Sequence, residues 1–163
     1  MRLNKYLSDR GICSRREADR LIEAGRVEVN GEKAVPGMQA DPTCVIRIDG
    51  KKIEPTEKKV LLAFYKPKGV ECTTDTRVKN NVISYINYPV RVYYAGRLDK
   101  DSQGLLLLTN RGDLANEMMK AGNFHEKEYE VTVDKPVTEG FIRKMSQGVP
   151  ILGTITRECR VWK

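Results

Sequence analysis

The side chains best suited to chemistry lie in one loop, Gly-Arg-Leu-Asp-Lys-Asp-Ser-Gln-Gly at 96–104. Counted from Asp99, the loop has acids at the first and third positions and Gly104 at the sixth, which suggests a calcium-binding loop. The fifth position is Gln103, however, and the twelfth is Asn110, where such a loop has a bidentate Glu. We therefore exclude a calcium site. Two interpretations stay open: a turn in which Asp99 and Asp101 bond backbone amides, or a loop that offers a reactive carboxylate.

The composition limits which other sites are available. The 163 residues include one His and four Cys, and the Cys spacing fits neither a zinc site nor a dense disulfide framework. The net charge of +7 favours a polyanionic partner. No apolar run approaches the length of about 18 residues that a membrane span needs. We therefore expect a cytoplasmic protein that makes no membrane contact.

Two short helices and two hairpins are expected in the first third of the chain. Apolar residues at i, i+3 and i+4, from Leu3 to Leu7, predict a short helix that Gly11 ends. Ser14 and Glu17 have the spacing of a capping box, which predicts the start of a second helix. Asn-Gly at 30–31 and Asp-Gly at 49–50 are strong hairpin signals between alternating apolar residues.

The rest of the chain is predicted to mix strands and helices in irregular order, as in an α+β fold with a mainly antiparallel sheet. We expect three domain parts: a module at 1–53, a linker at 54–59 and a second domain at 60–163. The predicted strands are 60–65, 90–95, 105–109, 129–133 and the end at 160–163. Helices are expected after the capping residues Asp113 and Thr138.

Basic side chains collect around the second predicted helix. Residues 1–26 contain seven basic and four acidic side chains. A solvated face with i, i+4 ion pairs would explain them equally well. The order of elements favours RNA, because a short helix, a Gly turn, Ser-Arg-Arg-Glu-Ala-Asp-Arg and an Asn-Gly hairpin resemble the S4-type RNA-binding domain. This resemblance implies phosphate contacts from Arg2, Lys5, Ser14, Arg15, Arg16 and Arg20.

The loop at 96–104 resembles the catalytic motif of the pseudouridine synthases when it is taken with the apolar run that follows. Tyr-Lys-Pro-Lys-Gly at 65–69 is similar to that family's first motif, and the segment 125–136 to its strand motif with an active-site Tyr. Gly-Val-Pro-Ile-Leu-Gly-Thr at 148–154 resembles the branch that carries an S4-type domain and modifies ribosomal RNA. The likeness covers nearly the whole chain and is greatest to the large-subunit enzymes.

The resemblance assigns roles to particular residues. Asp99 would be the catalytic carboxylate, Tyr129 would pack against the target base and shuttle a proton, and Arg97 would assist base flipping. Lys66 and Lys68 would bind the RNA backbone. The implied substrate is structured RNA, ribosomal (23S) first and transfer RNA second, and the implied enzyme is a monomer that uses no cofactor and no metal.

Two other functions stay open from the residues alone. A non-catalytic RNA-binding protein would use the S4-like module and keep the acidic loop inert. A hydrolase would use the pair Asp99 and Asp101, although neither has an evident metal ligand or base partner. The chain also ends at Arg-Val-Trp-Lys, before the last motif of the resembled enzymes. We therefore expect a partial catalytic domain that is inactive or unstable by itself.

Overall fold

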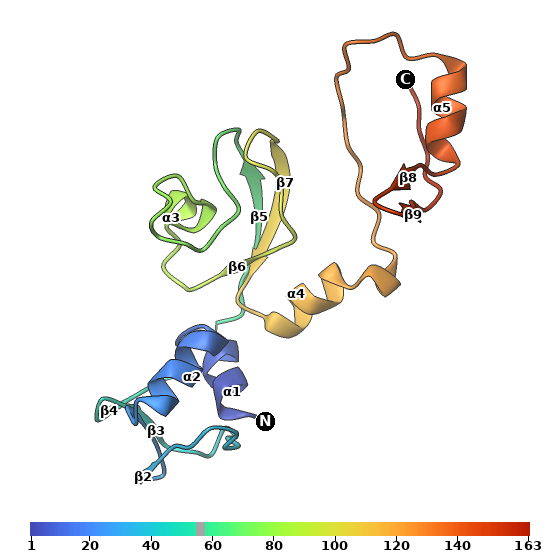
Figure 1. Ribbon diagram of the computed structural model, residues 1–163. Helices are drawn as coiled ribbons and strands as arrows, with labels where there is room; N and C mark the ends of the chain where they lie inside the picture. Colours follow the sequence, from blue (N-terminus) through green and yellow to red (C-terminus); the bar gives the residue numbers. More distant parts are fainter. Residues whose placement is uncertain (55–57) are drawn as a thin grey trace. The chain divides into compact units, whose positions relative to one another are not determined.

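The computed structural model describes residues 1–54 and 58–163, in two compact units, Met1–His125 and Glu126–Lys163. Figure 1 shows the ribbon of both units, coloured along the sequence from the N-terminus to the C-terminus. Short helices and antiparallel sheets make up both units, which confirms the predicted α+β class. No described helix is long and apolar enough to cross a membrane.

The first two helices form where the sequence predicts them. Helix α1 spans Leu3–Asp9 and α2 spans Arg15–Glu23. The backbone N–H of Glu17 donates to Ser14 Oγ at 3.1 Å, so the predicted cap is confirmed. Both helices pack their apolar stripes into one core, whose most buried members are Leu3, Leu7, Ala18 and Val27.

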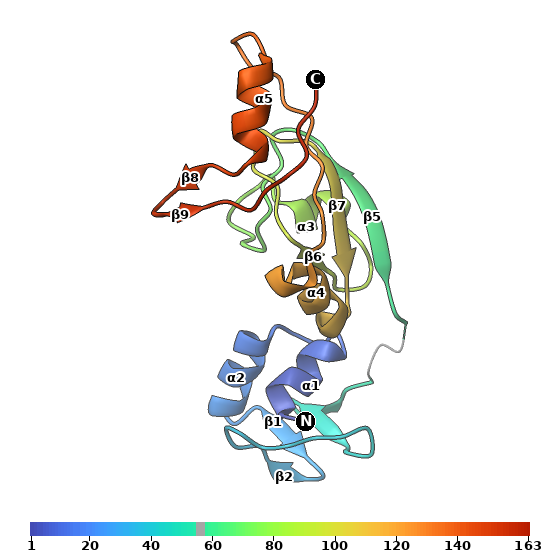
Figure 2. The ribbon, with the colours of Figure 1, turned by 90° about the vertical axis from the view of Figure 1, so that its right-hand side faces the viewer.

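A four-stranded antiparallel sheet completes this core, in the order β2-β1-β3-β4. Figure 2 shows β1 and β2 below α1 and α2. Its strands are β1 Val27–Val29, β2 Glu32–Lys33, β3 Ile46–Ile48 and β4 Lys51–Lys52. Asn30 and Asp49 start the two hairpin turns with φ of 53° and 50°. These left-handed values are the reason that Asn-Gly and Asp-Gly are favoured there, and both hairpin predictions are confirmed.

A second core lies under a three-stranded sheet of order β5-β7-β6. Its strands are β5 Leu61–Lys66, β6 Tyr93–Ala95 and β7 Gly104–Thr109. Leu106 and Leu108 point into this core, against which α3 (Val82–Ile86) also packs. The opposite face of β5 and β7 is exposed at Leu61, Tyr65 and Leu105. The strands were predicted, whereas α3 was not.

Helix α4 spans Gly112–Met119 and is followed by a 3-10 turn, Ala121–Asn123. The prediction that Asp113 caps α4 is wrong. Arg111 occupies the cap position, and Asp113 lies in the first turn, where its carboxylate pairs with the Arg111 guanidinium at 2.6 Å. This ion pair lowers the pKa of Asp113 to about 2.

The second unit contains α5, Glu139–Ser146, and a small hairpin of β8 (Pro150–Ile151) and β9 (Thr154–Ile155). Thr138 caps α5 as predicted, through a hydrogen bond from the Phe141 N–H. The predicted strands at 129–133 and 160–163 are absent from the described residues. A strand needs a hydrogen-bonded neighbour, and no described segment pairs with either stretch. None of the described side chains of this unit is fully buried.

The division into domains at 1–53 and 60–163 stays a prediction. Within the predicted linker, 54–59, residues 55–57 lie outside the described part of the chain.

Candidate active site and RNA-binding surface

Backbone hydrogen bonds hold the loop between β6 and β7. The Ser102 N–H donates to the Asp99 carbonyl at 3.1 Å, which closes a turn. The carbonyl of the next residue, Lys100, accepts the Gly69 N–H at 2.7 Å and the Lys66 ammonium at 3.3 Å. The segment after β5 therefore fixes the loop directly beside Asp99.

The carboxylate of Asp99 is free for a reaction. Its side chain is exposed, and no described residue donates a hydrogen bond to it or pairs with it. Asp101 is equally open. The turn is closed by the backbone carbonyl of Asp99, so the Asx-type interpretation is wrong and the carboxylate remains available to a ligand.

Arg97 is also exposed, two residues before Asp99. A purely structural Arg97 would form an ion pair with an acid of the loop. No carboxylate of the described residues forms an ion pair with Arg97. Its charge reaches Tyr94, whose phenol has a raised pKa: burial is the largest cause, Cys72 adds to it, and Arg97 opposes it. The loop thus presents a guanidinium and a carboxylate from one short stretch. The described residues include no group of three or more His, Cys, Asp or Glu that could hold a metal ion.

Lys66 is the most buried polar side chain near the loop, with 0% of its surface exposed. Its ammonium donates to the carbonyls of Pro67 at 3.0 Å, Val70 at 2.8 Å and Lys100 at 3.3 Å. All three N–H groups are used inside the protein. The prediction that Lys66 contacts the RNA backbone is therefore corrected: it ties two loops together. Lys68 is exposed, and its assignment as an RNA contact stays a prediction.

Tyr129 lies in the second unit, in a segment without secondary structure, and 68% of its surface is exposed. Its assignment as the residue that packs against the base therefore stays a prediction.

The predicted RNA contacts of the first module lie at the surface. Arg2, Arg15, Arg16 and Arg20 are exposed, and Lys5 and Ser14 are partly so. Arg20 pairs with Glu17, and Lys5 lies 3.7 Å from Asp9. No carboxylate of the described residues pairs with Arg15 or Arg16. The Ser14 oxygen accepts the helix N–H, which leaves its hydroxyl hydrogen available as a donor.

Comparison with known proteins places this site in a family. The family model described as RNA pseudouridylate synthase matches residues 60–149, which contain the loop at 96–104 and the turn after Lys66. The chain belongs to the RNA pseudouridylate synthases. A second family model, the S4 domain, matches residues 1–43 of this pseudouridylate synthase, which confirms both resemblances.

Two relatives and one solved structure illustrate the likeness. The dual-specificity RNA pseudouridine synthase RluF of Escherichia coli (strain K12) is 56% identical over 100% of this chain and 57% of its own length. The uncharacterized RNA pseudouridine synthase ML1370 of Mycobacterium leprae (strain TN) is 40% identical over 93% of this chain and 62% of its own. A crystal structure of a pseudouridylate synthase aligns with TM-score 0.61 and 27% identity, covering 98% of this chain and 71% of that one. The chain thus spans a little over half of these curated relatives.

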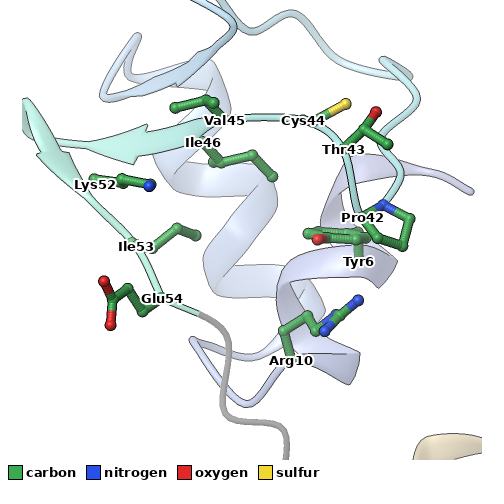
Figure 3. A pocket seen from close by; sticks show the side chains of 10 residues that line it. All are labelled: Tyr6, Arg10, Pro42, Thr43, Cys44, Val45, Ile46, Lys52, Ile53 and Glu54. Atoms are coloured by element: carbon green, nitrogen blue, oxygen red, sulfur yellow. The ribbon is translucent and has the colours of Figure 1, made fainter.

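A groove of about 300 Å³ in the S4 domain lies away from the synthase residues described above (Figure 3). Ile46 and Ile53 point into it from the sheet side, and it is also lined by Tyr6 of α1 and by Arg10, the residue that follows α1. The Arg10 guanidinium lies over the Tyr6 ring, 5.2 Å from its centre. None of the predicted RNA contacts lines this groove.

Sequence reasoning missed two residues that contact the loop at 96–104. Glu71 pairs with Lys100 at 3.0 Å, and Cys72 Sγ accepts the N–H of Leu98 at 3.4 Å. These partners are 26 to 29 positions apart in the printed sequence. No local pattern marks them, because only the folded loops bring them together.

Proposed function

We propose that this protein converts a uridine of ribosomal RNA to pseudouridine, with 23S RNA of the large subunit as the first candidate substrate and transfer RNA as the second. The observation that carries the proposal is the open carboxylate of Asp99 in a loop whose backbone is fixed. Membership of the synthase family and the exposed cations of the S4 domain support it. We further propose that the enzyme acts in the cytoplasm as a monomer.

The reaction balances without an external reagent. The bond between N1 of uracil and C1′ of the ribose breaks, the base rotates, and a bond between C5 and C1′ forms. The hydrogen on C5 leaves as a proton, and N1 gains one. Because no electrons are gained or lost, one carboxylate can serve as the nucleophile without a redox partner.

Each site residue has a distinct task in this scheme. The Asp99 carboxylate attacks the sugar or the ring, or assists a route in which the sugar loses a proton. Tyr129 packs against the base and moves the C5 proton. Arg97 occupies the space that the extruded uridine leaves, which offsets part of an unstacking cost of a few kcal/mol.

Substitution of Asp99 by Asn tests the proposal. The amide keeps the shape and removes the nucleophile, so hydrogen release from C5 of labelled uridine in unmodified ribosomal RNA should fall below detection while RNA binding persists. Asp101→Asn is the matched control, because it removes an exposed carboxylate two residues away and should retain release. The assay uses the full-length protein.

The competing function is RNA binding without catalysis. It would be adopted if the unmutated full-length protein bound ribosomal RNA but released no hydrogen from it. Pseudouridine mapping in ribosomal RNA from cells that lack the protein would then show no missing site.

A further inference from the structure

The catalytic loop is held on both sides of Asp99 by two consecutive residues, Glu71 and Cys72. The backbone N–H of Leu98 donates to Cys72 Sγ at 3.4 Å. The ammonium of Lys100 lies 3.0 Å from a carboxylate oxygen of Glu71. Leu98 and Lys100 are the two chain neighbours of Asp99, so one dipeptide restrains the residue before it and the residue after it.

This dipeptide is itself firmly anchored. The Glu71 N–H donates to the Asn80 carbonyl at 2.9 Å, and the Glu71 carbonyl accepts the Val82 N–H at 2.9 Å. Val70, just before it, is 1% exposed, and its carbonyl accepts the buried Lys66 ammonium. The contacts to the catalytic loop therefore start from an immobilised segment of backbone.

We propose that Glu71 and Cys72 are positioning residues for the Asp99 carboxylate. The inference rests on the proposed function. Since no described side chain makes a hydrogen bond or an ion pair with the carboxylate of Asp99, the placement of that group depends on the backbone on either side of it. A displacement of about 1 Å can reduce a catalysed rate roughly 100-fold. The two contacts are weak alone, because the ion pair is exposed and a thiol is a poor acceptor. Their loss should therefore lower kcat far more than it lowers stability.

The test compares kcat and KM for C5 hydrogen release by full-length variants. Cys72→Ala and Glu71→Gln should each lower kcat about tenfold, within the range for misplaced groups, and leave KM for the RNA within about twofold. Cys72→Ser restores an acceptor and should recover most of the rate. Cys44→Ala and Glu28→Gln are matched controls, since they make the same changes at partly buried positions within the first 54 residues.

Two further measurements separate positioning from general damage. Hydrogen exchange at the Leu98 amide should accelerate in Cys72→Ala and slow again in Cys72→Ser. The kcat losses of Glu71→Gln and Lys100→Gln should not add in the double variant, because both remove one contact. If Cys72→Ala does not fold, Glu71→Gln and its double variant with Lys100→Gln still decide the question.

If kcat is normal in both Glu71→Gln and Cys72→Ala, and Leu98 exchange is no faster in Cys72→Ala, the inference is overturned while the synthase activity stands. An unmutated protein without hydrogen release would overturn the proposed function itself, and the inference with it.

Discussion

The Nζ atom of Lys66 lies 3.3 Å from the carbonyl oxygen of Lys100, a residue 34 positions away in the chain and adjacent to Asp99. The same ammonium also holds two carbonyls of its own turn. A buried cation thus joins the segment after β5 to the loop at 96–104, with backbone oxygens as its partners.

Replacing Lys66 with Met should lower the free energy of unfolding by at least about 2 kcal/mol, because three carbonyls lose a donor inside the protein. Chemical denaturation measures this. Lys68→Met is the matched control, since Lys68 is exposed and its loss should change stability by less than about 0.5 kcal/mol. Equal stabilities of the two variants would contradict the structural role of Lys66.

RNA binding should depend on salt through Arg15 and Arg16. Each contact with a phosphate adds about 0.7 to 0.9 to the slope of log affinity against log salt. Arg15→Gln and Arg16→Gln should each reduce the slope by about that amount, as measured by RNA binding between 50 mM and 200 mM salt. Lys33→Gln on β2 is the control. If the slope is unchanged in both Arg variants, Arg15 and Arg16 make no phosphate contact and belong to a solvated face.

Truncation of side chains on the two faces of β7 should lower the free energy of unfolding by very different amounts. Leu108 is 0% exposed and Leu105 is 66% exposed. Leu108→Ala should lower the free energy of unfolding by about 2 to 5 kcal/mol, and Leu105→Ala by less than about 0.5 kcal/mol. Thermal and urea unfolding of both variants check this. A large loss in Leu105→Ala would mean that the outer face of the sheet is covered in solution.

The Asp113 carboxyl should titrate near pH 2, because the hydrogen bond from Arg111 holds its pKa well below the usual value of about 3.9. A pKa that is lower in the folded state gives stability that is present above about pH 3.9 and lost as the pH falls through about 2. In Arg111→Met, the pKa of Asp113 measured by NMR titration should rise toward about 3.9. The pKa of Asp75, which Arg77 lowers to about 2, should stay unchanged there.

Local features of this protein could be read directly from the sequence. The Ser14 cap, the Thr138 cap and the two hairpin turns depend on residues within four positions of each other, so the chemistry of one short stretch decides them. The family motifs likewise mark the catalytic loop, because its residue types lie side by side in the chain.

Long-range packing decided the rest. The alternating apolar residues at 129–133 give one apolar face, but a strand also needs a neighbouring strand to pair with. No described segment pairs with 129–133. Lys66 looks like a surface cation in a Lys-Pro-Lys-Gly turn, yet it is fully buried and its ammonium donates to three backbone carbonyls. Likewise, Glu71 and Cys72 meet the loop only because antiparallel pairing of β5 with β7 brings their ends together. Side-chain types set which contacts are chemically possible, whereas the pairing of distant segments selects the ones that form.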